Sequence, residues 1–396
     1  DKRIIIVLSL NRPKARKMSR LLPVMLLSTI ATGALADINI GVTLSTRGPA
    51  ASLGIPEKNT IELLPRMIAG HKVNYIVLDD ASDSLAAVKN TKILIGEHKV
   101  DLVIGSTTTP NSLAMIDVVA ASETPMIALA ASSLIVEPMD YKRMWVFKTP
   151  QNDAQMSTAI IEHMTNNGVK TAAYIGFADN YGEDWWKGFS KLAEVRKIKL
   201  VGNERYKRTD AVVTEQVQKV MAAKPDAVLI GAAGMPAMPP LKLLKEKGYL
   251  GLIYQTHGVA SKEWLRLCAK DCEGLVLPVS PLLVAAQLPA ENQAKKPALE
   301  YTAKYEAKYG KGSVSTFGAY AWDAGILLAN AAPVALKKAL PGSREFRLAL
   351  RDALEESKNI AAAHGVFNMS AADHQGFDQR ARVMVRIENN NWKLVR

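Results

Sequence analysis

The sequence has few of the features that indicate catalysis or metal binding. It has two cysteines and six histidines, and no pair of histidines has the spacing of metal ligands. It also contains no G-x-S-x-G, H-E-x-x-H, P-loop or G-x-G-x-x-G motif. We therefore expect no metal, no cofactor and no catalytic residues, and an enzyme of hydrolase or flavodoxin-like type is not predicted.

The charge balance does not indicate nucleic-acid binding. The formal net charge is +12, but residues 1–36 hold seven basic side chains and only one acid, so residues 37–396 carry a net charge of +6. Their lysines and arginines are scattered and do not cluster with aromatic residues. With 48% hydrophobic and 22% charged residues, the composition is that of a globular protein.

The two cysteines, Cys268 and Cys272, are separated by four positions. On a continuous helix this spacing strains disulfide geometry. Asp271 and Gly274 indicate that the helix ends nearby, which relaxes the constraint. The sequence leaves both a disulfide and two free thiols open.

The apolar run near the start of the sequence is too short to span a membrane and predicts a secretory signal peptide instead. Met18 is the expected start, Arg20 supplies the positive end, and the run 21–35 leads into an A-x-A cleavage site that ends at Ala36. Residues 1–17 are then read as upstream of the start. We expect a periplasmic protein that is cleaved after Ala36.

After residue 36, short apolar strands alternate with amphipathic helices in two series, and the chain is too long for one hydrophobic core. The expected strands lie near 38–44, 73–78, 102–104 and 126–130 in the first series, and near 171–175, 200–206, 227–230, 252–254 and 275–279 in the second. Between the first two strands we expect a helix with Ile61, Leu64 and Ile68 on one face. This alternation predicts an α/β fold with two doubly wound parallel-sheet lobes.

The domain prediction follows from the places where the alternation of strands and helices is interrupted. The extended segment 144–150 ends the first series, and helices without intervening strands follow a Pro-rich passage at 278–289. We expect a leader at 1–36, lobe 1 at 37–148 plus 282–363, and lobe 2 at 149–281 plus 364–396. Three crossings between the lobes form a hinge with a central cleft.

In open parallel sheets a ligand binds at the carboxyl ends of the strands. Two of the loops predicted there, 105–109 and 130–133, are rich in serine, threonine and alanine and lead into helix starts. Free backbone N–H groups and hydroxyls at such positions suit a carboxylate. The alternative is that these side chains only cap helices.

These loops resemble those of the periplasmic solute-binding proteins of ABC importers, in the branched-chain amino-acid class with a type I periplasmic-binding-protein fold. The resemblance rests on the order of four motifs from residue 37 to about 395: 48–54 (GPAASLG), the turn opened by Gly105, 179–183 (DNYGE) and 254–259 (YQTHGV). It implies that Thr109, Ala131 and Ser132 grip a ligand carboxylate and that Tyr181 covers the ligand. Leu53 stands where amino-acid binders often have an aromatic residue. From the same loops we add Thr108 and Met235 to the predicted site.

One departure from that family bears on the ligand. Amino-acid binders usually place an acid in the loop 255–259, to pair with the ligand ammonium, but this chain has His257 there. A neutral imidazole cannot replace a carboxylate facing a buried cation. Arg47 in the first loop adds positive character, so we expect an aromatic or 2-oxo acid. The alternatives are that Arg47 faces solvent, that His257 packs locally, or that Asp179 or Asp323 supplies the acid.

The resemblance implies a binding protein that delivers a small organic acid to an ABC permease in the inner membrane and works as a monomer, without metal, cofactor or nucleic acid. The alternatives are a binding protein for branched-chain or other amino acids, and a ligand-sensing receptor domain of the same fold.

Overall fold

The computed structural model describes residues 36–395, in which two large sheets and a two-stranded hairpin are formed. The described residues belong to one compact unit. The predicted signal peptide and the residues before Met18 lie outside the described residues.

The first sheet has the predicted parallel, doubly wound arrangement. Its strands are β1 (Ile38–Leu44), β2 (Met67–Ile68), β3 (His71–Asp79), β4 (Leu102–Gly105), β5 (Met126–Ala128) and β6 (Val146–Lys148), in the order β2-β3-β1-β4-β5-β6. β1 pairs in parallel with both β3 and β4, so the strand order reverses at β1. A reversal of this kind opens a crevice at the carboxyl ends of the strands.

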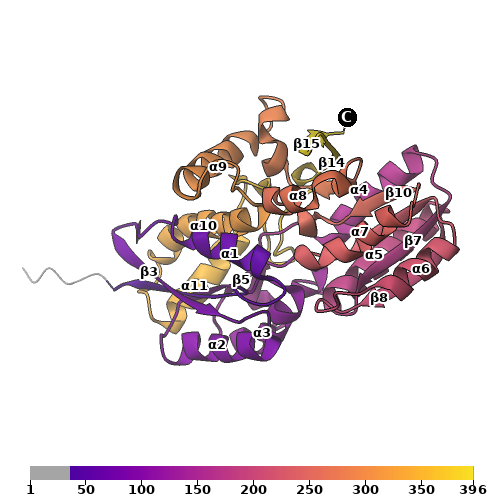
Figure 1. Cartoon of the computed structure of the whole chain (residues 1–396). Coiled ribbons are helices and arrows are strands. Elements are labelled where there is room, and N and C mark those ends of the chain that lie inside the picture. The colour runs from indigo at the N-terminus through magenta and orange to yellow at the C-terminus, as the bar shows by residue number, and fades with distance from the viewer. Residues whose placement is uncertain (1–35, 396) are drawn as a thin grey trace, which may run out of the picture. The chain divides into compact units, whose positions relative to one another are not determined.

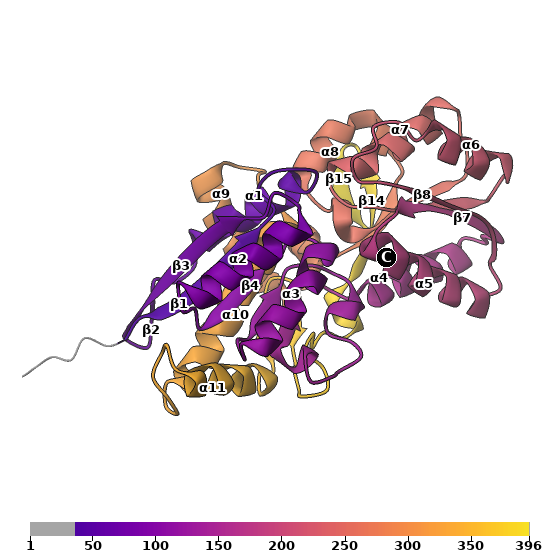
Figure 2. The same ribbon diagram turned by 90° about the horizontal axis from the view of Figure 1, so that it is seen from below.

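Both faces of the first sheet are covered by helices. These are α1 (Ala51–Ile61), α2 (Ser84–Gly96), α3 (Thr109–Ala121), α10 (Thr316–Ala335) and α11 (Arg344–Glu355), with α9 (Lys295–Tyr309) further out. α2 and α3 lie on one face, and α1 and α10 lie on the other with α11 beside α10 (Figures 1 and 2). Ile104 and the adjacent Val103 belong to different core clusters, as the two-residue period of a strand requires. We call this part lobe 1.

The second sheet repeats the parallel arrangement in five strands, carries two antiparallel strands at one edge, and also confirms the predicted fold class. Its strands are β7 (Thr171–Phe177), β8 (Lys199–Tyr206), β9 (Ala227–Gly231), β10 (Leu252–Gln255), β11 (Val276–Val279), β14 (Val383–Glu388) and β15 (Asn391–Leu394), in the order β15-β14-β11-β10-β9-β7-β8. Its helices are α4 (Asp153–Asn166), α5 (Asn180–Val195), α6 (Thr214–Ala222), α7 (Met238–Glu246) and α8 (Lys262–Cys268). α4 and α5 cover one face while α6 and α7 cover the other (Figure 2). We call this part lobe 2.

The predicted helix through Ile61, Leu64 and Ile68 is wrong. α1 ends at Ile61, and Ile68 lies in β2, which pairs with the start of β3 as an antiparallel hairpin. The two turn residues, Ala69 and Gly70, have positive φ angles of 48° and 85°. Pro65 lacks a backbone N–H, so a helix could not continue through it without losing a hydrogen bond.

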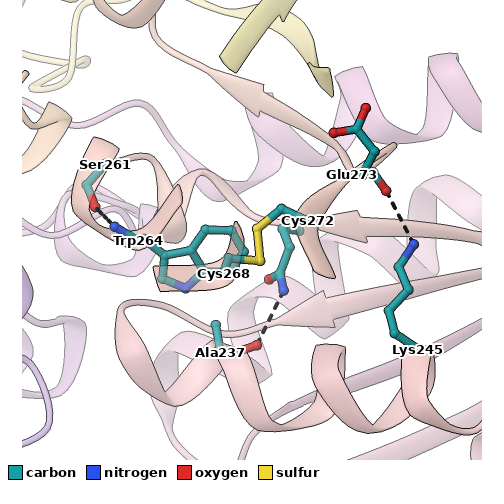
Figure 3. Close-up of a disulfide and its surroundings, with 8 residues drawn as sticks. Ala237, Lys245, Ser261, Trp264, Cys268, Cys272 and Glu273 are labelled. Carbon is teal, nitrogen blue, oxygen red and sulfur yellow. Dashed lines mark hydrogen bonds between the residues drawn. A yellow bond between two sulfur atoms is a disulfide. The ribbon is translucent and has the colours of Figure 1, made fainter. Parts of the chain in front are cut away.

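The cysteines form a disulfide, which was one of the two open alternatives. α8 ends at Cys268, and Ala269 has a positive φ of 50°, so the two cysteines do not share a continuous helix and their Cα atoms lie 5.6 Å apart. The pair is buried beside Trp264 (Figure 3). Nearby, the Lys245 Nζ donates a hydrogen bond to the Glu273 carbonyl at 3.3 Å.

The lobe boundaries remain a prediction: β6 ends at Lys148 and β11 at Val279, close to the first two boundaries, while the third, between 363 and 364, falls within a hairpin. There the chain forms the hairpin of β12 (Ile360–Ala361) and β13 (Val366–Phe367), which spans that boundary. The His374 ring then stacks on Phe147 of β6 with ring centres 4.0 Å apart. We propose that the third crossing lies at 378–382, where the carbonyl of Ala381 accepts a hydrogen bond from Gln151 at 2.7 Å.

None of the helices formed by residues 36–395 combines the length and the apolar character needed to cross a membrane.

Candidate ligand-binding cleft

One buried carboxylate holds together three loops at the carboxyl edge of the first sheet. Asp80 follows β3 and accepts hydrogen bonds from the hydroxyls of Ser45, after β1, and Ser106, after β4, both at 2.7 Å. It also accepts the backbone N–H of Ser82 at 3.0 Å. The Ser106 hydroxyl is therefore used in the scaffold. This arrangement fixes the start of the loop that leads into α3.

The amino end of α3 presents an unsatisfied hydroxyl. The Thr109 side chain is 2% exposed, and its Oγ1 has no hydrogen-bond partner among the described residues. Thr108 is the N-cap of α3, and its side chain makes no capping hydrogen bond. A helix start with free N–H groups attracts negative charge. A buried hydroxyl without a partner costs about 1–3 kcal/mol, which a bound acceptor would offset.

A buried lysine, Lys148, holds the loop after β5 through hydrogen bonds. The Lys148 Nζ donates to the carbonyls of Ala131 and Ser132 and, at 2.6 Å, to the Asn152 Oδ1. Burial lowers the pKa of Lys148 to about 8, against the opposing effect of Asp153 and Asp184. Two carbonyl oxygens of this loop are therefore occupied by Lys148.

Lobe 2 contributes an aromatic residue and an arginine. The Tyr181 hydroxyl hydrogen-bonds to Thr256 Oγ1 at 2.9 Å, and burial raises the pKa of Tyr181 well above its usual value. Arg208 lies just beyond β8, with its guanidinium carbon 4.2 Å from the ring centre of Phe177. The Arg208 Nε donates to Asp179 Oδ2 at 2.5 Å. Asp179 also caps α5 by accepting the Tyr181 N–H at 2.9 Å.

His257 is buried and neutral. It begins a short 3-10 turn (His257–Val259) after β10 and is 2% exposed. Burial, with smaller contributions from Lys148 and His364, lowers its pKa to about 3. Its Nδ1 has no hydrogen-bond partner among residues 36–395. The ring can therefore offer one donor or one acceptor but no positive charge.

Several of these residues line one small cavity. Its lining comes from both lobes and consists of Leu53, Thr107, Thr108, Thr109, Leu129, Ala130, Ala131, Tyr181, Arg208, Ala233, His257, Gly258, Phe317 and Tyr320. The set contains one cation and no aspartate or glutamate. Most of the other lining side chains are apolar, aromatic or hydroxyl-bearing.

Six of the nine predicted site residues lie in this lining, namely Leu53, Thr108, Thr109, Ala131, Tyr181 and His257. Arg47 does not: its side chain is 75% exposed and its Nε pairs with Asp79 Oδ2 at 2.5 Å. The alternative that Arg47 faces solvent is therefore correct. Ser132 and Met235 are also outside the lining, because the Ser132 hydroxyl is directed to Asp184 and Met235 packs at the edge of the large core.

Eight lining residues were not among the nine predicted ones, and the largest of them are Arg208, Phe317 and Tyr320. Arg208 follows β8 at the carboxyl edge of the second sheet, so the rule that selected the other loops also applied to it. Phe317 and Tyr320 lie in the first turns of α10, which no strand precedes. Only the packing of α10 on α1 brings these two rings to the cavity.

The acids that could have paired with a ligand ammonium have other roles. Asp179 pairs with Arg208, and Asp323 accepts the His364 Nδ1 at 2.7 Å and the Ala363 N–H at 2.9 Å. Two further carboxyl groups, Glu57 and Asp153, are fully buried but outside the lining, and burial raises the pKa of each well above its usual value. Residues 36–395 contain no group of three or more His, Cys, Asp and Glu side chains placed to hold a metal ion.

Two doubly wound sheets with a cavity between their carboxyl edges, lined by residues of both lobes, define the type I periplasmic-binding-protein fold. The chain belongs to the periplasmic binding protein family, whose family model matches residues 37–390. The resemblance drawn from the four motifs is thereby confirmed.

Individual relatives agree with this assignment. An extracellular ligand-binding receptor from Rhodopseudomonas palustris HaA2 is 42% identical, with a TM-score of 0.89 over 91% of this chain and 100% of that one. The Leu/Ile/Val-binding protein homolog 3 of Brucella melitensis is 23% identical, covering 86% of this chain and 89% of its own. A solute-binding protein of an ABC transporter from R. palustris, solved in complex with benzoate, shares the fold at 20% identity, with a TM-score of 0.80 over 91% and 96% of the two chains.

The protein is therefore a solute-binding protein of the periplasmic binding protein family. Its family is one of binding proteins and not of enzymes, and membership implies a location outside the cytoplasm.

Proposed function

We propose that the protein captures a small carboxylate without an ammonium group, such as an aromatic or 2-oxo acid, and delivers it to an ABC permease. The observation that carries this proposal is the buried, unpaired Thr109 hydroxyl at the start of α3, in a cavity lined by Arg208 and by no acid. The hydroxyl and the N–H groups of the helix start form the expected carboxylate site.

The same lining disfavours an amino acid. An uncompensated buried ammonium costs several kcal/mol, and the lining offers Arg208 and the neutral His257 where a carboxylate would be needed. Glu57 and Asp153 supply little fixed negative charge, since their raised pKa values favour the protonated forms. The apolar side chain of Leu53 and the aromatic rings of Phe317 and Tyr320 suit the body of an aromatic or aliphatic acid. The benzoate bound by the distant R. palustris protein shows that this fold accommodates such a ligand.

The test uses pairs of compounds that differ only at the α-carbon. Leucine is compared with 4-methyl-2-oxopentanoate, phenylalanine with phenylpyruvate, and benzoate is added as a ligand without either group. A ligand at a hundredfold its Kd adds about 2.7 kcal/mol of stability, which a thermal-shift assay detects and calorimetry then quantifies. We expect binding of benzoate or the oxo acids and none of the amino acids.

The second candidate is an amino-acid binding protein, which the Brucella relative's name favours. Asp153 of this chain also favours an amino-acid ligand. Both of its buried carboxylate oxygens lack hydrogen-bond partners among the described residues, and a ligand ammonium would supply donors. Micromolar binding of leucine without binding of its oxo acid would establish this second function and overturn the first.

A further inference from the structure

The loop 130–133 touches the opposite lobe through one carboxylate. The Ser132 hydroxyl donates to Asp184 Oδ2 at 2.6 Å, and the Ser133 N–H donates to the same oxygen at 3.1 Å. Asp184 lies on α5 of lobe 2, whereas the loop follows β5 of lobe 1. These hydrogen bonds can exist only while the two lobes are in contact.

The same loop lines the cavity with Ala130 and Ala131. Its other side is held by Lys148, which binds the carbonyls of Ala131 and Ser132. Lys148 is the last residue of β6 and belongs to lobe 1, so its contact with the loop does not depend on lobe closure. The loop therefore has one permanent support and one that depends on closure.

Neither support belongs to the cavity lining. Asp184 and Lys148 are both absent from it, and Ser132 and Lys148 are fully buried. Charge-assisted hydrogen bonds to a carboxylate are about twice as strong as neutral ones. Asp184 can therefore shift the equilibrium between the open and the closed arrangement of the lobes, although it does not contact the ligand.

We propose that Asp184 is a closure latch: it holds the Ala131–Ser133 loop in its ligand-binding conformation only when the lobes are closed, while Lys148 holds the same loop in both states. Asp184 is then a positioning residue that slows ligand release. The proposal rests on the proposed function only in requiring that the cleft binds a small molecule, whatever its class.

The test compares Asp184→Ala with the matched control Glu183→Gln, the neighbouring acid on α5, which pairs with Arg205 outside the cavity. Benzoate and leucine are the probes, and the one that binds the wild-type chain is used. Asp184→Ala should raise Kd at least tenfold through faster dissociation, with the melting temperature of the ligand-free chain unchanged. Glu183→Gln should leave Kd unchanged.

A double-mutant cycle identifies the partner. If Asp184 acts through the loop, then Ser132→Ala should also weaken binding, and the double variant should be little worse than Asp184→Ala alone. Lys148→Met should weaken binding too, but it should also lower the melting temperature of the ligand-free chain. Strictly additive effects of the Ser132 and Asp184 substitutions would overturn the latch, as would an unchanged Kd for Asp184→Ala.

A distance measurement separates the latch from the choice of ligand. Leu85 and Val212 follow β3 and β8 at the cleft edges of the two lobes and are 81% and 75% exposed, so spin labels at L85C and V212C report lobe separation. If neither probe binds the wild-type chain, the ligand-free distance distribution decides the latch. A closed population that Asp184→Ala removes supports it, and identical distributions overturn it.

Discussion

Leu53 of lobe 1 lies directly against Gly234 of lobe 2: a Cβ atom placed on Gly234 would be 2.7 Å from the Leu53 Cδ1. Gly234 has a φ of 62° and a ψ of −155°, a conformation that side-chain-bearing residues rarely adopt. The two lobes therefore meet without spare room at this point of the cavity wall.

The first prediction tests this close approach. Leu53→Phe should raise the ligand Kd at least tenfold, because the larger ring cannot fit against Gly234 when the lobes close. The ligand-free melting temperature should stay unchanged, since an open cleft has room for the ring. Leu53→Met, which conserves volume, is the control and should bind as the wild type does. Calorimetric titration measures both, and equal affinity for Leu53→Phe and Leu53→Met would contradict the prediction.

The second prediction concerns the carboxylate. Thr109→Val keeps the shape of the side chain but removes the unpaired hydroxyl, and a hydrogen bond to a charged group contributes about 1.5–3 kcal/mol. Binding should therefore weaken at least about tenfold, while the fold remains intact by circular dichroism. Thr109→Ser, which retains the hydroxyl, should recover most of the affinity. Unchanged affinity in Thr109→Val would move the carboxylate elsewhere in the cleft.

The third prediction concerns Arg208. Replacing it by methionine removes the only cation of the lining, so the Kd of a carboxylate ligand should rise at least tenfold. Arg205→Met is the matched control: Arg205 lies in β8, pairs with Glu183 and is absent from the lining. Affinities of the two variants are compared by titration. A larger loss in Arg205→Met than in Arg208→Met would show that the electrostatic field of lobe 2, and not a contact, attracts the ligand.

The fourth prediction follows from the lowered pKa of His257, about 3 in the folded chain. The usual value for histidine, about 6.5, applies to the unfolded chain. The unfolded state therefore takes up a proton first as the pH falls below about 6.5, and the folded state loses stability. Between pH 7 and pH 5 this amounts to about 2 kcal/mol.

The measurement is the free energy of unfolding at the two pH values. The loss on acidification should be smaller in His257→Gln than in the wild type by about that amount. The exposed His98, replaced by glutamine, is the control and should keep the wild-type dependence. Parallel curves for the wild type and His257→Gln would show that His257 is protonated in the folded chain.

The fifth prediction concerns processing. Because β1 begins at Ile38, directly after the A-x-A site that ends at Ala36, the mature chain should start at Asp37. Intact-mass spectrometry of periplasmic material measures this, and a chain starting at residue 1 or 18 would rule out the cleavage.

The local patterns of the sequence were sufficient for most of the parallel strands. Strand Ile38–Leu44 was predicted with its observed bounds, because a parallel strand covered on both faces is a short apolar run bounded by turns. The helix expected through Ile68 failed, because apolar residues at helical spacing continued across Pro65 while the chain had already turned into a hairpin. The hairpin at 360–367 was missed, since two-residue strands carry no periodicity.

In the site, the sequence by itself determined the residues whose position follows from the end of a strand, such as Thr109 after β4 and Tyr181 after β7. It could not decide which of two arginines faces the cavity. Arg47 and Arg208 each follow a strand. Arg47 pairs with Asp79 at the surface, whereas Arg208 pairs with Asp179 and lies over the Phe177 ring at the cleft. The aromatic wall from α10 and the contact of Ser132 with Asp184 were likewise decided by the tertiary structure. Each of these contacts joins residues that are far apart in the chain. Local sequence patterns do not predict them, because such contacts form only after the chain has folded and distant segments meet.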